Sequence, residues 1–335
     1  MSRQARIAIV CAAGGLLLFL ALRGVSLTAV RDLVAGADAR WVGAALAVYL
    51  SAYVLRSLRW RLILRPVQSV RFSESFFMLM AGYFVNYVIP VRAGEVAKAF
   101  FLKRLRGVPV ATSLPTIYVD KLFELLSIAL VLALLPALSL RLQGYVATLV
   151  VSVLVVFLLA VALLLFALVN GRGTVRALSS ATAWLAPAAR DRLARWFTLL
   201  VEGMGVARAS ARSLWALVAL TAAAVLLDAV YFWLMFRAFS IEIAFPQVLF
   251  GYTLLSVSYI LPTPPAQIGH NEFLMGVIFA DGLGVDRTSA AALMLLAHAL
   301  TGALITGVGL WSFGAMSIRV TDSFRGRGRR EAGAA

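Results

Sequence analysis

Apolar residues fill most of the chain in long runs that short polar or basic stretches separate. A helix needs about 20 apolar residues to cross the hydrocarbon core of a bilayer. The pattern therefore predicts an all-α integral membrane protein. About six transmembrane helices are expected, at residues 5–22, 41–58, 115–135, 145–169, 213–237 and 288–316. The short, mixed stretch 24–40 is expected outside the membrane.

Two further apolar segments, 73–104 and 246–280, are interrupted by helix-breaking residues. Proline removes a backbone donor and glycine loosens a helix. A break at membrane depth is tolerated only where protein or a watery cavity surrounds it. We therefore expect two broken re-entrant hairpins. The residues at the breaks are Asn86, Pro90, Arg92, Gly94 and Glu95 in the first, and Pro262, Pro264 and Gly269 in the second.

The composition supports a membrane protein, with 62% hydrophobic residues, 14% charged residues and a mean hydropathy of +0.93. Soluble domains have nearer to 25% charged residues. No stretch of ordinary composition is long enough for a soluble catalytic domain. The chain has one cysteine, Cys11, so no disulfide framework is expected.

The net charge of +16 raises the question of nucleic acid, which we do not expect as a partner. Most of the 31 lysines and arginines flank apolar segments, as the positive-inside rule and anionic headgroups favour. Arg56, Arg59 and Trp60, for instance, are expected at a cytoplasmic interface. The distribution predicts a multi-pass protein of the inner membrane of the cell, with both termini in the cytoplasm.

This topology makes the first hairpin enter from the cytoplasm and the second from outside. Broken segments in corresponding positions of two oppositely oriented halves indicate an inverted-repeat transporter. We predict a single transmembrane domain, 1–318, with an amphipathic cytoplasmic connector between the repeats. The repeats are expected at about 41–169 and 213–318, the connector at 170–212, and a basic tail at 319–335.

The first break contains candidate ligands for a phosphate group. Arginine matches phosphate geometry in bidentate fashion, so Arg92 is expected to bind phosphate, with Glu95 orienting it or carrying a proton. An internal Arg92–Glu95 ion pair that holds the hairpin shut is the alternative. Such a buried pair rarely adds net stability, and we therefore favour a functional role.

Three charged residues of one helical turn follow in the next helix: Asp120, Lys121 and Glu124. They are expected either to pair with Arg92 across a cavity or to be solvated near an interface, because Pro115 is close. Asp228 lies alone in an apolar helix and needs a partner, which Arg56 or Arg92 can supply.

The second break, PTPPAQIGHNE at 262–272, has a similar set of polar residues. Gln267, Asn271 and Glu272 are candidate ligands there, since helix ends present free backbone donors to an anion. An ordinary outer loop with a proline-capped helix is the alternative. His298 is either a proton carrier or a packed polar residue, and we favour packing.

Familiar catalytic motifs are absent from the sequence: it has no H-E-x-x-H, no G-x-S-x-G and no P-loop. His270 and His298 have no further ligands at zinc spacing. We therefore expect no enzymatic activity, no metal and no cofactor.

The motifs R-S-L-R-W (56–60), N-Y-V-I-P-V-R-A-G-E (86–95) and P-T-P-P-A-Q-I-G-H-N-E (262–272), with Asp120, resemble one family. This is the transmembrane region of lysylphosphatidylglycerol synthase, also called the flippase-like family. In bifunctional members this region is thought to move an aminoacylated phospholipid that a soluble domain makes. We expect no such soluble domain in this protein, so aminoacyl transfer is not implied. Pro265-Ala266 also replaces the glycine usual in the second motif.

We expect a flippase-like protein that moves or binds an anionic phospholipid or a polyprenyl-phosphate-linked lipid. Alternatives are a non-transporting scaffold for a lipid-modifying enzyme or glycosyltransferase, and, ranked last, a membrane-embedded transferase. A partner enzyme and a homo-oligomer stay open. Residues expected to contact the lipid are Asn86, Arg92, Glu95, Asp120, Lys121, Gln267, Asn271 and Glu272. Structural or gating roles are expected for Pro90, Gly94, Pro262, Pro264 and Gly269, and buried charges for Arg56, Glu124 and Asp228.

Overall fold

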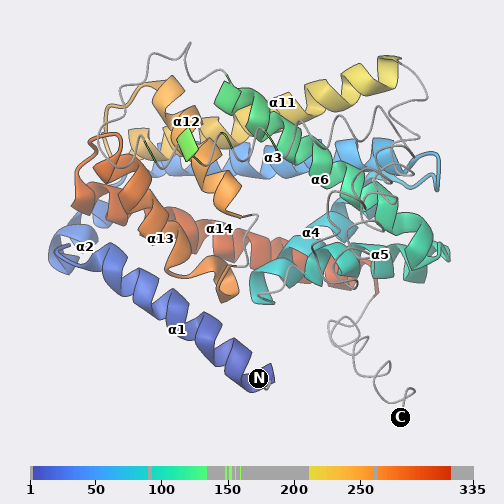
Figure 1. Cartoon of the computed structure of the whole chain (residues 1–335), viewed down its shortest axis with the longest axis horizontal. Helices are drawn as coiled ribbons and strands as arrows, with labels where there is room; N and C mark the ends of the chain where they lie inside the picture. Colours follow the sequence, from blue (N-terminus) through green and yellow to red (C-terminus); the bar gives the residue numbers. More distant parts are fainter. Residues whose placement is uncertain are drawn as a thin grey trace.

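The computed structural model describes residues 3–89, 93–133, 211–259 and 263–317, with isolated helical positions at 148, 151, 152, 155 and 159 (Figure 1). Throughout these residues the chain forms helices and turns and no strand, as the all-α prediction requires. Several predictions lie outside the described residues. They concern Pro90, Arg92, Pro262, most of the helix at 145–169, the connector up to residue 210 and the tail 319–335.

Three long apolar helices form the frame of the described fold: α3 (Ala39–Leu64), α11 (Ala211–Ala238) and α14 (Arg287–Ala315). Each is long and apolar enough to cross a membrane. A helix of this kind satisfies its backbone hydrogen bonds internally, as a bilayer demands. In Figure 1, α3 and α11 lie along one side of the molecule, and α14 lies along the other.

The N-terminal helices differ from the prediction in one respect. Helix α1 (Arg3–Leu22) matches the first predicted run, but within residues 24–40, where no helix was predicted, Leu27–Ala35 form α2. The two helices meet at an angle of 83° and make a fourth candidate span if they are counted as one bent segment. Ser26 caps α2 by accepting a hydrogen bond from the Ala29 amide, which explains why a helix starts there.

Small side chains allow α3 and α11 to pack closely along their length. Ala45 and Ala52 of α3 and Ala224 and Ala229 of α11 are almost completely buried. Without a hydrophobic driving force between helices in lipid, such close packing supplies much of the association energy. The two helices, one from each predicted repeat, therefore form the centre of the described bundle.

The first interrupted segment forms two helices, α4 (Phe72–Val88) and α5 (Ala93–Arg106), within the predicted limits 73–104 or close to them. They pack against each other across the break. A Cβ atom on Gly94 would lie 2.0 Å from the carbonyl oxygen of Gly82, so only glycine permits this approach. The next helix, α6 (Val110–Ala133), starts before the predicted Pro115, which lies inside it.

The second interrupted segment has four short elements: α12 (Phe245–Ser258), η2 (Pro265–Gln267), α13 (His270–Met275) and the π-helical η3 (Gly276–Asp281). The backbone of Ala266 and Gln267 is left-handed, with φ of 52° and 60°. Such non-glycine conformations cost about 1–3 kcal/mol each and persist only where the surroundings hold them. Gly269 also has a positive φ, and a Cβ atom on it would lie 2.0 Å from the carbonyl oxygen of Gly14 in α1.

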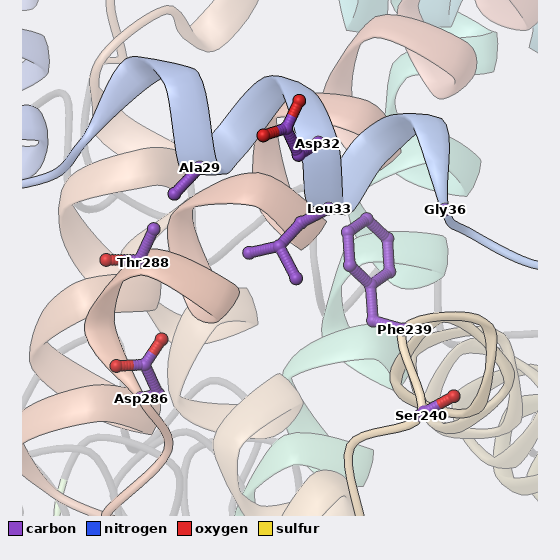
Figure 2. Close-up of a pocket in the computed structure, with 8 residues that line it drawn as sticks. All are labelled: Ala29, Asp32, Leu33, Gly36, Phe239, Ser240, Asp286 and Thr288. Atoms are coloured by element: carbon purple, nitrogen blue, oxygen red, sulfur yellow. The ribbon is translucent and has the colours of Figure 1, made fainter.

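A cavity of 540 Å³ lies between α2, the end of α11 and the start of α14 (Figure 2). Its polar lining includes Asp32, Asp286, Thr288 and Ser240. Asp286 is the N-cap of α14 and accepts a hydrogen bond from the Ser289 amide. The cavity contains none of the predicted site residues, and its polar groups are explained by helix capping and exposure.

Candidate functional site

A buried ion pair between α3 and α6 forms the centre of the charged site. Arg59 Nε donates to Asp120 Oδ1 at 2.8 Å, and Arg59 Nη2 donates to Glu124 Oε1 at 3.0 Å. The side chains of Arg59 and Asp120 are only 1% and 2% exposed. Arg59 and Trp60, predicted near a cytoplasmic interface, are both buried among helices, so Arg59 faces its partners in the bundle.

Helix α5 adds a second cation and a carboxylate to this centre. Lys98 Nζ lies 2.9 Å from Glu95 Oε2 and 3.9 Å from Asp120 Oδ2. Lys121 of α6 lies 3.3 Å from Glu95 Oε1 and 2.7 Å from Glu124 Oε2. The two lysines therefore connect the helix after the first break to α6.

We call these six residues the charged network: Arg59, Glu95, Lys98, Asp120, Lys121 and Glu124. Its three cations and three carboxylates balance. Three members, Arg59, Lys98 and Asp120, are at most 4% exposed and form a buried base. Glu95, Lys121 and Glu124 are 18–25% exposed and form an accessible rim. A ligand therefore meets the rim first.

Asn86 holds the two sides of the first break together. Its Oδ1 accepts a hydrogen bond from the Gly94 amide at 2.7 Å, and its Nδ2 lies 3.4 Å from Glu95 Oε1. The close approach of α4 and α5 at Gly94 makes the first contact possible. Glu95 is thus placed by Asn86, Lys98 and Lys121 together.

A second buried ion pair joins α3 to α11. Arg56 and Asp228 form a bidentate contact in which Arg56 Nη1 lies 3.2 Å from Asp228 Oδ1. Tyr252 of α12 donates a hydrogen bond to the same carboxylate at 2.5 Å. Of the two partners that the sequence allowed for Asp228, the structure places Arg56 there. Arg56 therefore contacts α11 inside the bundle.

The second break is organised by Glu272 of α13. Its Oε2 accepts a hydrogen bond from the Gly269 amide at 2.8 Å, and its Oε1 lies 2.5 Å from His298 Nδ1. His298 Nε2 lies 2.6 Å from the carbonyl oxygen of Ala266. Both ring nitrogens of His298 are therefore engaged, an arrangement that fits a packed polar residue as well as a proton carrier.

The other predicted residues of the second break form a small hydrogen-bonded set. Asn271 Nδ2 donates to Gln267 Oε1 at 3.1 Å, and Tyr259 donates to Asn271 Oδ1 at 3.0 Å. His270 contacts Ser258 at 2.8 Å. These contacts tie the break to the end of α12, and Pro264 packs near Gly14 of α1.

Tyr87 brings the two breaks into proximity. It lies at the end of α4, next to Asn86, and its ring centroid is 6.3 Å from that of His298. Helix α4 also packs against α14 and η2. The end of the first broken segment therefore adjoins the second.

Lys98 and Tyr87 were not predicted as members of these sites, and Arg59 was predicted near an interface. Helical spacing was the available signal: Arg56 and Arg59 share one face of α3, and Glu95 and Lys98 share one face of α5. Basic residues near the end of an apolar run resemble interface residues, so burial was not evident.

Comparison with known proteins gives one family match over most of the chain. The family described as the lysylphosphatidylglycerol synthase TM region matches residues 4–309. A UPF0104 membrane protein of Methanothermobacter thermautotrophicus is 26% identical over 287 residues, 82% of each chain. A further match to a UPF0104 membrane protein of that organism is 30% identical over 154 residues, 45% of this chain and 42% of the relative.

Another relative is named glycosyltransferase AglD, of Haloferax volcanii. It is 33% identical over 125 residues, which are 35% of this chain. The match spans only 20% of the length of AglD, so most of that protein has no counterpart in the alignment. No solved structure matches the chain.

Proposed function

The chain belongs to the family of the lysylphosphatidylglycerol synthase transmembrane region and is a multi-pass membrane protein, and we propose that it binds an anionic lipid headgroup and moves it between leaflets. The lipid class is a phospholipid or a polyprenyl-phosphate-linked lipid. Both carry a phosphate at the membrane interface, and that phosphate is the group that the charged network would recognise.

The accessible rim of the charged network is the observation that carries this proposal. Lys121 is 25% exposed and is shared by Glu95 and Glu124. Because the network is electrically balanced, an incoming phosphate takes the place of a carboxylate at Lys121. Glu95, which belongs to the first broken segment, is the carboxylate that would be displaced. Binding thereby acts on the helix next to the break.

The buried base gives the rim a fixed position. Arg59, Asp120 and Lys98 hold α3, α5 and α6 together through charge-assisted hydrogen bonds and ion pairs. Removing charges from water is costly, and a buried ion pair rarely adds net stability compared with apolar residues. Three buried charged residues therefore fit a recognition site better than a purely stabilising role.

The full topology belongs to the same proposal. It has about six transmembrane helices and two re-entrant hairpins of opposite orientation, with both termini on the cytoplasmic side of the inner membrane. The two halves form inverted repeats at about 41–169 and 213–318, joined by the connector 170–212. Support comes from the breaks after α4 and α12 and from their proximity at Tyr87.

Each predicted site residue has a role in this proposal. Arg92 and Lys121 bind the phosphate on one side, where Glu95 gives way to it and Asn86 and Asp120 position the charged groups. Gln267, Asn271 and Glu272 form the opposing polar surface. Pro90, Gly94, Pro262, Pro264 and Gly269 provide the gating breaks. No catalytic step, metal or cofactor is assigned to the chain.

A scaffold function is the second candidate, because one relative is named a glycosyltransferase. The chain would then hold a glycosyltransferase or another lipid-modifying enzyme at the membrane without moving lipid itself. This candidate predicts an enzyme complex that forms independently of Lys121 and Glu95. A homo-oligomer is compatible with both candidates.

Reconstitution with labelled lipids tests the proposal. Purified protein in liposomes is supplied with fluorescent phosphatidylglycerol or a polyprenyl phosphate, and exposure of the label in the outer leaflet is followed over time. Lys121→Gln is expected to slow movement by about tenfold or more, as the loss of one charge-assisted contact implies. Arg92→Ala, at the first break, is tested in the same assay and should also slow lipid movement.

The matched control is Arg106→Gln. Arg106 forms an ion pair with Glu74 at 2.6 Å in which the two side chains are 35% and 26% exposed. This change removes one positive charge outside the charged network and should leave lipid movement unchanged. Equal rates for wild type, Lys121→Gln and Arg92→Ala would contradict the proposal and favour the scaffold. Native mass spectrometry of co-purified lipid identifies the headgroup.

A further inference from the structure

The hydrogen-bond partners of His298 indicate how many protons the His298–Glu272 pair carries. A backbone carbonyl oxygen only accepts hydrogen bonds, so Nε2 carries the hydrogen that it donates to Ala266 at 2.6 Å. Nδ1 and Glu272 Oε1 lie 2.5 Å apart, and two lone pairs at that distance repel. One additional proton therefore lies between the imidazole and the carboxylate.

We propose that the Glu272–His298 pair is a proton-binding site, and that its shared proton fixes the Pro264–Gly269 loop to α14. With the proton bound, the pair is neutral overall and satisfies both the carboxylate and the Ala266 carbonyl. The two side chains are 4% and 10% exposed, so water does not readily replace either contact. The ligand of this site is the proton.

Loss of the proton breaks one particular contact. Neutral His298 has a single N–H, which serves either the Glu272 carboxylate or the Ala266 carbonyl. A hydrogen bond to a charged carboxylate is roughly twice as strong as one to a neutral acceptor. The remaining hydrogen therefore stays on Nδ1, and Nε2 no longer donates to Ala266.

The backbone of the loop is strained, so loss of this contact favours a change in its conformation. Ala266 and Gln267 are both left-handed, a conformation that non-glycine residues adopt only when other contacts hold them. Without the bond from His298, the strain favours a different backbone conformation of the loop. Glu272 still holds the Gly269 amide, so the rearrangement is confined to the residues before Gly269.

Other titratable groups face the pair from the elements packed around it. Tyr87 of α4, Tyr259 after α12 and His270 of α13 all lie within electrostatic range of Glu272. His270 contacts Ser258 and not the loop carbonyl, so its titration does not release Ala266. The two tyrosines are ordinarily neutral throughout the range in which a histidine titrates.

Proton binding would couple lipid movement to a pH difference across the membrane. The loop adjoins the first break through Tyr87, so its release changes the polar surface opposite the charged network. This last step rests on the proposed function, whereas the proton-dependent contact between His298 and the loop does not.

Hydrogen–deuterium exchange on the full chain in lipid nanodiscs tests the contact directly. The amides of Gln267 and Ile268 are hydrogen-bonded within the loop and report on its conformation. After correction for intrinsic exchange, protection in the wild type should fall about tenfold between about pH 5 and about pH 9, as loss of one hydrogen bond implies. Constant protection over this range would overturn the proposal.

Two variants give opposite expectations. In Glu272→Gln the amide oxygen accepts from Gly269, the amide nitrogen donates to Nδ1, and His298 keeps its N–H for Ala266 without any extra proton. The loop should therefore stay protected at every pH. In His298→Ala the loop should be unprotected at every pH. Wild-type pH dependence in Glu272→Gln would contradict the proposal.

His270→Gln is the matched control, because it removes the neighbouring histidine and leaves the pair intact. His270→Gln should keep the pH dependence of the wild type. If the pH dependence is lost in this variant, the effect belongs to His270 instead. Lipid movement under a pH gradient is measured separately in liposomes. If no lipid moves while exchange follows the pattern above, the proposed function fails and the proton-binding site stands.

Discussion

Arg59 Nε and Asp120 Oδ1 lie 2.8 Å apart in a place where neither side chain is more than 2% exposed. The pair joins α3 to α6, and Lys98 approaches the other carboxylate oxygen to 3.9 Å. Asp120 is therefore shared by two cations. Neutralising it leaves a buried excess of positive charge that water does not reach.

Asp120→Asn tests the importance of this shared carboxylate. Removing one partner of a buried ion pair typically destabilises a protein by about 3–5 kcal/mol. The thermal midpoint of the purified protein in detergent, followed by tryptophan fluorescence, should fall strongly. Glu74→Gln is the control, since its partner Arg106 is 35% exposed and a surface pair contributes about 0–1 kcal/mol. Similar midpoints for the two variants would contradict the assigned burial.

The Arg56–Asp228 pair is expected to behave as one coupled unit. Each single change, Arg56→Met or Asp228→Leu, leaves a buried charge and should destabilise the protein, whereas the double variant removes both charges. A double-mutant cycle on the free energy of unfolding should give an interaction energy of about 1–3 kcal/mol. Additive effects would mean that the two side chains do not share a contact in the folded protein.

Gly94→Ala should separate the two helices of the first break. The new Cβ would lie 2.0 Å from the Gly82 carbonyl and 2.7 Å from the Asn86 side chain, so α4 and α5 must move apart. We expect a lower thermal midpoint and at least about tenfold slower lipid movement, because Glu95 shifts with α5. Gly43→Ala in α3 is the control, since nothing lies within 4 Å of its Cβ position. That variant should be as stable as the wild type or more stable.

Asp286 should give the start of α14 a pH-dependent stability. The Ser289 backbone amide donates to its carboxylate at 2.8 Å and holds the pKa of that carboxyl below its ordinary value. Because the pKa is lower in the folded state, the contribution is complete above the ordinary pKa. It is lost as the pH falls through the folded pKa.

Asp286→Ala should therefore cost about 1 kcal/mol near neutral pH, the usual value of a lost N-cap, and less under acid conditions. Thermal midpoints measured over a pH series check this. Asp286→Asn keeps an acceptor oxygen without the titration, so its midpoint should differ little from the wild type near neutrality. A constant difference between wild type and Asp286→Ala at all pH values would contradict the capping role.

Long hydrophobic runs were enough to predict α1, α3, α11 and α14 and the interruptions after Val88 and Ser258. Helix formation in apolar segments depends on local sequence, because a spanning helix satisfies its own backbone. The interruptions also depend on local sequence, because Pro264 and Gly269 affect only the backbone around them. Helix α2 was missed because its nine residues are short and of mixed composition.

The partners of the buried charges were decided by tertiary structure. Arg59 and Lys98 occur near the ends of apolar runs, where the sequence alone suggests an interface. Whether such a side chain reaches water or a carboxylate depends on which helices pack beside it. Asp120 lies 61 residues from Arg59 in the chain, and no local pattern links the two.

The sequence by itself determined the class of the protein, its apolar helices and the positions of its two interruptions, since these depend on composition and on residues close together in the chain. Tertiary structure alone decided that Lys121 belongs to an accessible rim, that Asp228 pairs with Arg56 and that Glu272 contacts His298. Those contacts join helices distant in sequence, and their energies depend on burial, which only the folded bundle creates.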